Sequence, residues 1–192
     1  MKIAITQREL EYNGIIYDCL ERGWHELFAP HAVITIPNLQ HCNQTNFDML
    51  VISGGNNSID RFRTEFECYK VAWQRNLPII GICHGAFFLN EIHGGVTGTI
   101  DGHQNCQHKI IMDDQEHLVN SYHNSRIDKL GQDLVPIATA ESDVEGFKHV
   151  ERPIWGLVWH PERMMEPVLP KMLKNLINYE YCLTSIKQKP LI

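Results

Sequence analysis

Hydrophobic positions in the first half of the chain fall into short runs that are separated by polar or helical stretches. Two of these runs, Phe47–Ser53 and Pro78–Cys83, are continuously apolar, which is typical of strands buried on both faces of a sheet. Shorter strands are predicted at Lys2–Thr6 and at Ala32–Ile36, where Pro37 ends a run rich in β-branched residues. The first half therefore supplies four predicted strands.

Helical spacing occurs between these predicted strands. Thr64–Arg75 places aromatic side chains three or four positions apart, and His84–Ile92 predicts a short helix directly after the fourth strand. A longer helix is predicted over Tyr12–Phe28, either broken by Gly23 or ended by Pro30. Strands that alternate with helices through short connections imply a parallel sheet with right-handed crossovers.

The pattern changes beyond Gly94, where short apolar runs are separated by polar turns. These runs predict strands that add to the sheet in antiparallel fashion, namely Lys109–Met112, Leu118–Ser121, Val135–Thr139 and Ile154–Trp159. A closing helix is predicted over Val168–Ser185. We therefore expect one three-layer α/β domain over residues 1–192, with a mainly parallel sheet and antiparallel additions in the C-terminal half.

Composition narrows the class of protein. The 192 residues, of which 43% are hydrophobic and 21% are charged, suffice for a globular core without disulfides or metals. A net charge of -6 argues against a nucleic-acid partner, because duplex binders usually present a basic face. The start of the chain lacks signal-peptide features, and no apolar run approaches the ~18 residues that span a bilayer. We expect a cytoplasmic protein with no membrane partner.

The six cysteines are scattered along the chain, and in a reducing compartment we interpret them as free thiols: Cys19, Cys42, Cys68, Cys83, Cys106 and Cys182. Cys83 stands between a predicted strand and a predicted helix, with Gly81 and Gly85 on either side. A sharp strand-to-helix turn needs small flanking residues, because neighbouring backbone passes close. The helix N-terminus favours a thiolate, so Cys83 is a candidate nucleophile. The alternative is a buried structural cysteine with incidental glycines.

A second motif supplies a base. Trp159-His160-Pro161-Glu162 follows an apolar run, and Pro161 biases His160 toward an extended backbone. Residues i and i+2 of an extended chain project to the same side, so His160 and Glu162 are predicted to lie together. The carboxylate would orient the imidazole that faces the Cys83 thiol. A surface turn explains this segment alone, but not its combination with the glycine-flanked cysteine.

A third segment, Ser53-Gly54-Gly55-Asn56-Asn57, closes the predicted strand that ends at Ser53. Paired glycines leave backbone N–H groups free to point at a developing oxyanion. We expect the amides of Gly55 and of His84, the residue after the nucleophile, to be the two donors. A phosphate cradle or a simple turn is also compatible with this segment.

Together these segments resemble the class I glutamine amidotransferases, and within them the γ-glutamyl hydrolase branch. The resemblance covers most of the chain in the family's order and includes Asp60-Arg61 with Glu65, Arg75–Cys83, Leu89-Asn90, Gly94-Gly95, Val119–His123, Val144–Gly146 and Gly156–Glu162. It implies a flavodoxin-like sheet, with Cys83, His160 and Glu162 as the catalytic triad. It also implies a γ-glutamyl thioester on Cys83 that water resolves, with no cofactor and no metal.

The resemblance further implies contacts to a small γ-glutamyl substrate. In this family the Asn-Ser-x-His segment helps to hold the α-amino and carboxylate groups of the glutamyl moiety. The predicted substrate contacts are Gly54, Asn56, Ser121, Tyr122 and His123, and Glu145 is a further candidate. The alternative for His123 is a polar residue on a hairpin. Phe87 and Val158 stand where the family usually has glutamine, which puts free glutamine in doubt as the preferred substrate.

The opening of the chain resembles small members of the family associated with bacterial surface-polysaccharide and phosphoramidate pathways. The segments that carry this resemblance are Ile5–Arg8, Asp18–Leu20 and Gly23-Trp24. They imply a nucleotide-linked substrate such as γ-glutamyl-CDP-amidate, cleaved to glutamate and a CDP-linked amide. Arg8, Arg61 and Arg63 are then candidate phosphate contacts, with solvated surface residues as the alternative.

Three other functions stay open. A glutaminase subunit that passes ammonia to a partner synthase would use the same triad, and the sequence specifies neither such a partner nor an oligomeric state. Asp101–His108 offers histidine and cysteine donors for a metal-binding or regulatory module, although it lacks a CxxC pair and an HExxH frame. A catalytically inactive relative is disfavoured, because all three triad residues are present.

Overall fold

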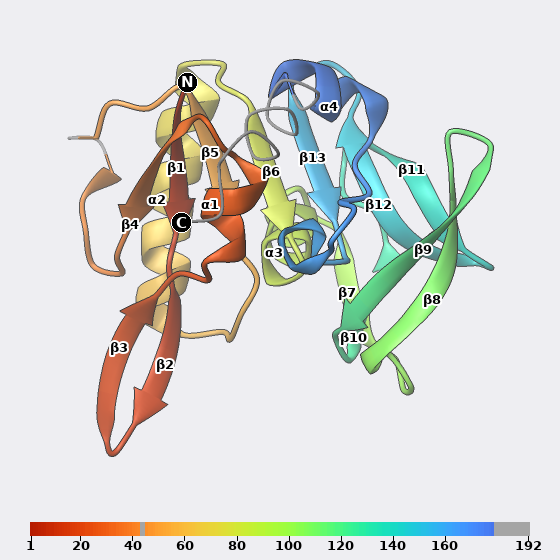
Figure 1. Cartoon of the computed structure of the whole chain (residues 1–192), viewed down its shortest axis with the longest axis horizontal. Helices are drawn as coiled ribbons and strands as arrows, with labels where there is room; N and C mark the ends of the chain where they lie inside the picture. Colours follow the sequence, from red (N-terminus) through yellow and green to blue (C-terminus); the bar gives the residue numbers. More distant parts are fainter. Residues whose placement is uncertain (43–44, 179–192) are drawn as a thin grey trace, which may run out of the picture.

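The computed structural model describes residues 1–42 and 45–178 (Figure 1). Within these ranges, a nine-stranded sheet has the order β4-β1-β5-β6-β13-β12-β11-β8-β9. The first five of these strands are mutually parallel, and their bounds are β4 Ala32–Ile36, β1 Lys2–Thr6, β5 Met49–Ile52, β6 Ile79–Ile82 and β13 Ile154–Leu157. The other four join in antiparallel fashion, and their bounds are β12 Asp143–His149, β11 Leu134–Ala140, β8 Gln104–Met112 and β9 Gln115–Tyr122.

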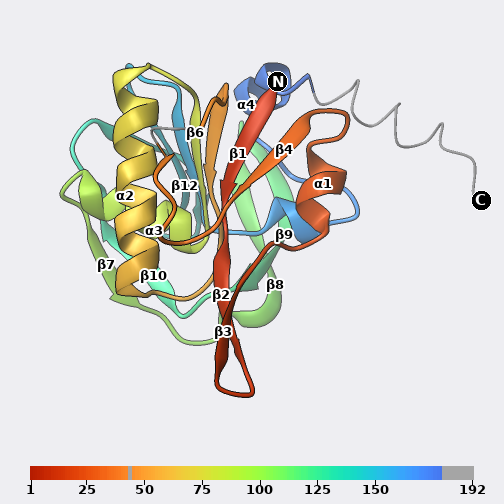
Figure 2. The same ribbon diagram turned by 90° about the vertical axis from the view of Figure 1, so that its left-hand side faces the viewer.

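Helices cover both faces of the parallel half, as Figure 2 shows. The helices are α1 Gly23–Leu27, α2 Ile59–Gln74, α3 His84–Ile92 and α4 Lys171–Leu176. Alternate side chains of β1 divide between two cores, with Ile3 and Ile5 under α1 and α4 and Ala4 under α2 and α3. Strands with two buried faces must be apolar throughout, which is why β5 and β6 stand out in the sequence as continuous apolar runs. The predicted three-layer α/β fold with a flavodoxin-like parallel half is confirmed.

The helix predicted over Tyr12–Phe28 is wrong for most of its length. Strands β2 (Arg8–Tyr12) and β3 (Ile15–Cys19) form a hairpin there, and only the five-residue α1 is helical. The turn is Asn13-Gly14, whose φ angles of 53° and 75° are both positive. Asn-Gly is the preferred pair for a two-residue hairpin turn of this hand, so local turn chemistry overrides the helical spacing.

Several boundaries differ from the prediction. Helix α2 begins at Ile59 and not at Thr64, because Ser58 caps it by accepting a hydrogen bond from the Arg61 amide. Strand β13 pairs in parallel with β6, whereas an antiparallel addition was expected. The ribbon of β7 (Val96–Thr99) with β10 (Ser125–Lys129), like β12, had no predicted counterpart.

The closing helix predicted over Val168–Ser185 is described only in part. Helix α4 starts three residues late, directly after Pro170, and ends at Leu176. Residues 179–185 lie outside the described ranges. None of the helices in the described ranges combines the length and the apolar character needed to cross a membrane.

The expectation of free thiols is wrong for two cysteines. Cys42 and Cys68 form a disulfide with a Cα–Cα distance of 5.1 Å, in the usual range for such a bond. Both are fully buried, and Cys68 lies on α2. They are 26 residues apart in sequence, so only the packing of α2 against the segment before β5 brings them together. Cys19, Cys83 and Cys106 are free, and Cys182 lies outside the described ranges.

Candidate active site

Cys83 lies in the predicted turn between β6 and α3. Its φ of 50° and ψ of -106° are strained for a residue with a side chain. The two flanking glycines explain how the turn is accommodated. A Cβ at Gly81 would overlap the carbonyl of Gly85, and a Cβ at Gly85 would overlap the carbonyl of Ile52. The glycine-flanked cysteine therefore marks a turn in which three pieces of backbone meet closely.

His160 and Glu162 lie together as predicted, but the extended His-Pro-Glu segment expected from the sequence is wrong, because Pro161–Arg163 form a 3-10 helix with His160 at its N-cap. The His160 Nδ1–H donates to Glu162 Oε1 over 2.6 Å, and both residues are buried. This bond occupies Nδ1 and leaves Nε2 as the other ring nitrogen, and Cys83 is near enough to raise the pKa of the ring. Gly54 lies against the Cε1 edge of the imidazole, where a Cβ would overlap Cε1.

The environment of His160 favours its protonated form. Burial alone lowers the pKa of the imidazole, but hydrogen bonds and charge from Cys83 and Glu162 outweigh burial and raise the pKa to about 9. A ring with this pKa is a strong acceptor for the thiol proton. The arrangement therefore places a basic, oriented imidazole beside the thiol, as the activation of a cysteine nucleophile requires.

Asn120, on β9, holds the backbone of His160 in place. Its Nδ2 donates to the His160 carbonyl and its Oδ1 accepts from the His160 amide, both over 2.8 Å. Sequence reasoning did not assign this role to Asn120. Tyr122, two residues further along β9, places its ring edge-on to the imidazole, with a centroid distance of 5.6 Å.

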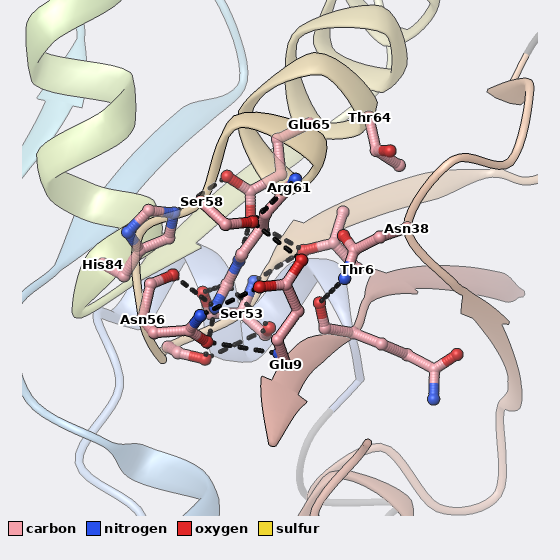
Figure 3. Close-up of polar contacts among 12 residues, drawn as sticks. Thr6, Glu9, Asn38, Ser53, Asn56, Ser58, Arg61, Thr64, Glu65 and His84 are labelled. Carbon is pink, nitrogen blue, oxygen red and sulfur yellow. Dashed lines mark hydrogen bonds and ion pairs between the residues drawn. The ribbon is translucent and has the colours of Figure 1, made fainter. Parts of the chain in front are cut away.

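A buried ion pair on α2 connects the glycine segment to the residue after the nucleophile (Figure 3). Arg61 Nε donates to Glu65 Oε1 over 2.7 Å, and Glu65 Oε2 pairs with His84 Nε2 over 2.8 Å. The Arg61 guanidinium also donates to the backbone carbonyls of Ser53 and Asn56. One pair of side chains thus holds both the segment that contains Gly55 and the side chain of His84. The backbone amides of these two residues are the predicted oxyanion donors.

The arginines predicted as phosphate contacts have different surroundings. Arg61 is fully buried and is used in the internal network, so its assignment as a phosphate contact is wrong, and it is not a solvated surface residue either. Arg8 is partly exposed and pairs with Glu21 over 2.9 Å. Arg63 is exposed on α2 and belongs to the rim of the cavity beside Cys83.

A cavity of about 800 Å³ opens beside Cys83. Of the predicted site residues, its wall contains Gly55, Cys83, His84, Tyr122 and His123. The wall also contains a cation and several aromatic rings from α2 and α3 that were not predicted to contact the glutamyl group, namely Phe62, Arg63, Phe87 and Phe88. The cavity therefore combines the Cys83 thiol with an apolar side that also contains Arg63 and Glu91.

Three predicted substrate contacts have protein partners. Ser121 is fully buried, and its hydroxyl donates to the carbonyl of His103 over 2.5 Å. The Asn56 side chain exchanges hydrogen bonds with Glu9 on β2. Gly54 packs against the His160 ring. Their contact with a substrate stays a prediction.

Comparison with known protein families matches residues 16–178 to the model for "Glutamine amidotransferase class-I". The chain belongs to this family. Membership confirms the resemblance seen in the sequence motifs. At the level of the family, it also confirms the expected class of enzyme, a cysteine-nucleophile hydrolase of γ-glutamyl amides. The match spans the turn of Cys83 and the His160–Glu162 pair.

Individual relatives of this class I glutamine amidotransferase include a hydrolase and subunits of synthases. A γ-glutamyl-CDP-amidate hydrolase of Campylobacter jejuni is 28% identical over 85% of the chain and 90% of that protein. A GMP synthase (glutamine-hydrolysing) subunit of Archaeoglobus fulgidus is also 28% identical, over 92% of the chain and 97% of that protein. A solved structure from Thermoplasma acidophilum, described as a putative GMP synthase subunit, has a TM-score of 0.73 at 24% identity and covers 98% of both chains. This last likeness supports the fold alone.

Proposed function

We propose that this chain hydrolyses a γ-glutamyl amide bond through a γ-glutamyl thioester on Cys83. The observation that carries the proposal is the strained Cys83 at the wall of a large cavity, with the buried His160–Glu162 pair beside it. A thiol in this position meets the geometric requirement for a nucleophile with an adjacent, oriented base.

The first half of the reaction forms the thioester. His160 Nε2 takes the proton of the Cys83 thiol, and the thiolate attacks the γ-carbonyl carbon of the substrate. The amides of Gly55 and His84 hold the negative charge that develops on the carbonyl oxygen. The imidazolium then gives its proton to the leaving nitrogen as the C–N bond breaks, and the amide product departs.

The second half regenerates the enzyme. His160 Nε2 removes a proton from a water molecule, which attacks the thioester carbonyl. Glutamate leaves and Cys83 recovers its proton from His160. Glu162 keeps its hydrogen bond to Nδ1 in both halves, so the same ring nitrogen faces the reacting atoms throughout.

For the substrate we propose γ-glutamyl-CDP-amidate, as in the Campylobacter relative, in surface-polysaccharide phosphoramidate synthesis. The cavity of about 800 Å³ is large for a free amino acid. Its outer side carries Phe62, 52% exposed, next to the exposed Arg63. Aromatic rings and a cation are suited to a base and a diphosphate. We also propose that the protein acts in the cytoplasm.

The experiment is glutamate release by the purified chain from γ-glutamyl-CDP-amidate, simple γ-glutamyl amides and glutamine. We expect release that is fastest with the nucleotide-amidate and abolished in Cys83→Ala. Cys19→Ala, which removes a free cysteine on β3, is the matched control and should retain full activity. Turnover that survives in Cys83→Ala would refute the nucleophile, and equal rates on plain amides would refute the nucleotide-linked substrate.

A second candidate function is a glutaminase subunit that supplies ammonia to a partner synthase. The near-complete overlap with the Archaeoglobus relative favours it, since that protein is named as one subunit of a glutamine-hydrolysing GMP synthase. Phe87, in place of the family's usual glutamine, argues against it. Activity on glutamine that appears only when a synthase is added would establish this function in place of the hydrolase.

A further inference from the structure

Four buried or nearly buried ionisable side chains meet behind the wall of the Cys83 cavity. His103 and His123 flank the β8–β9 hairpin, His108 lies on β8, and Glu145 lies on β12. The Glu145 carboxylate is 3.9 Å from His103 Nδ1, 3.5 Å from His108 Nε2 and 3.9 Å from His123 Nε2. The three imidazoles thus converge on one carboxylate, with His103 and His108 from one segment and His123 and Glu145 from others.

The polar atoms at the centre of this cluster have no hydrogen-bond partners among the described residues. They are His103 Nδ1, both ring nitrogens of His108, His123 Nε2 and Glu145 Oε2. Glu145 and His123 are at least nine-tenths buried. Buried polar atoms are nearly always satisfied. His103 Nδ1, His108 Nε2, His123 Nε2 and Glu145 Oε2 lie together, so these four unpartnered atoms indicate a ligand.

The hydrogen bonding of His123 leaves a lone pair directed at this point. Its Nδ1 lies 2.7 Å from the Ser125 carbonyl oxygen, which can only accept, so Nδ1 carries the proton. Nε2 of the neutral ring is then unprotonated, with its lone pair on the side of Glu145. Histidines that bind metals usually have this arrangement, in which the other ring nitrogen donates to a carbonyl or carboxylate.

We infer that this cluster binds one divalent transition-metal ion, with Zn²⁺ as the reference ion, through His103, His123 and Glu145, with His108 Nε2 beside the Glu145 carboxylate. Two ligands at the usual zinc distance of about 2.0–2.1 Å in a tetrahedron are roughly 3.3 Å apart. The measured separations of 3.5–3.9 Å between Glu145 and the imidazoles are close to this value. The ligand atoms of His103, His123 and Glu145 all lie within 4.8 Å of one another. Imidazole and carboxylate are ligands that zinc accepts.

The two imidazoles and one carboxylate supply three protein ligands and leave one position of a tetrahedral site for a further ligand. The ion would join the β8–β9 hairpin to β12 and fix His123, which belongs to the wall of the Cys83 cavity. His123 and Glu145 would then act as metal ligands and not as contacts to the glutamyl group. The inference does not depend on the proposed reaction, because no step of that reaction uses these side chains.

The test measures zinc binding to the Cys83→Ala variant. In the unmodified chain, the Cys83 thiol and the His160 imidazole could bind zinc themselves and obscure the result. The metal-free protein is titrated with zinc chloride against a chromophoric chelator, and thermal unfolding is followed with and without zinc. We expect one zinc ion per chain and a higher Tm with zinc. His103→Gln and the near-isosteric Glu145→Gln should each weaken binding by at least about 100-fold and remove the shift in Tm.

The matched control is His25→Gln, which removes an exposed histidine outside the cluster and should leave both readouts unchanged. Near-ultraviolet circular dichroism of Glu145→Gln separates loss of the ligand from loss of the fold. The inference is refuted if the metal-free protein binds no zinc stoichiometrically, or if both cluster variants, correctly folded, bind zinc as tightly as the His25→Gln control.

Discussion

Asn120 and the backbone of His160 exchange two hydrogen bonds of 2.8 Å each, although the residues are 40 positions apart in the sequence. The side-chain amide of Asn120 donates one of these bonds to the His160 carbonyl and accepts the other from the His160 backbone amide. It connects β9, in the antiparallel half of the sheet, to the segment after β13 in the parallel half. The position of the His160 imidazole relative to Cys83 therefore depends on both halves.

Asn120→Ala removes both bonds without touching the cavity beside Cys83. We expect kcat to fall by about 10- to 100-fold, because displacements near 1 Å in a catalytic geometry have effects of this size. KM should change little, and the fold should persist by circular dichroism. Asn175→Ala, at an exposed position of α4, is the control. A kcat for Asn120→Ala equal to that of the control would show that Asn120 does not position His160.

The pH dependence follows from the raised pKa of His160. The imidazolium is present below about pH 9 and is lost above it, which removes the proton needed by the leaving nitrogen. We expect kcat/KM to decline on the alkaline side with a midpoint near pH 9. Because Glu162 is one of the groups that raise this pKa, Glu162→Gln should move the alkaline decline to lower pH. An alkaline limb that is unchanged in Glu162→Gln would contradict the assignment of this limb to His160.

The ion pair between Arg61 and Glu65 is expected to matter for stability because both side chains are fully buried. Glu65→Gln leaves the Arg61 charge buried without its partner, and we expect a loss of about 3 kcal/mol in the free energy of unfolding. Urea unfolding followed by tryptophan fluorescence measures this loss. The control is Glu26→Gln, which breaks an exposed i,i+4 pair with Arg22 and should change stability by less than about 0.5 kcal/mol. Equal effects of the two variants would show that burial does not set the strength of the Arg61–Glu65 pair.

The parts of the structure that could be predicted from the sequence are those set by neighbours along the chain. The apolar runs of β5 and β6, the glycine-flanked turn of Cys83 and the approach of His160 to Glu162 all arise within a few residues. The Asn13-Gly14 turn was also a local signal, and weighing it against the helical spacing would have identified the β2–β3 hairpin.

The parts that could not be predicted depend on register between distant segments. The clamp of Asn120 on His160 requires knowing how β9 lies relative to the segment after β13. The burial of Arg61 requires knowing which face of α2 contacts the sheet. The Cys42–Cys68 disulfide likewise depends on packing that spacing along the chain does not reveal.

The proposed nucleotide-linked substrate predicts a selective role for Arg63. Its side chain is exposed at the rim of the Cys83 cavity, where its weak pair with Asp60, at 3.7 Å, leaves it free to contact a phosphate. We expect Arg63→Ala to raise KM for γ-glutamyl-CDP-amidate roughly tenfold, the equivalent of one charge-assisted hydrogen bond. Turnover of a plain γ-glutamyl amide should be unchanged, because that substrate has no phosphate.

The control for Arg63→Ala is Arg22→Ala, at an exposed site directly before α1, on the face of the sheet opposite to α2. This variant removes an equal charge far from the cavity and should leave KM for both substrates unchanged. If both substrates instead lose activity equally in Arg63→Ala, the arginine supports the cavity wall and does not bind a phosphate. The nucleotide-linked substrate would then lose its main contact, while the proposed nucleophile Cys83 would be unaffected.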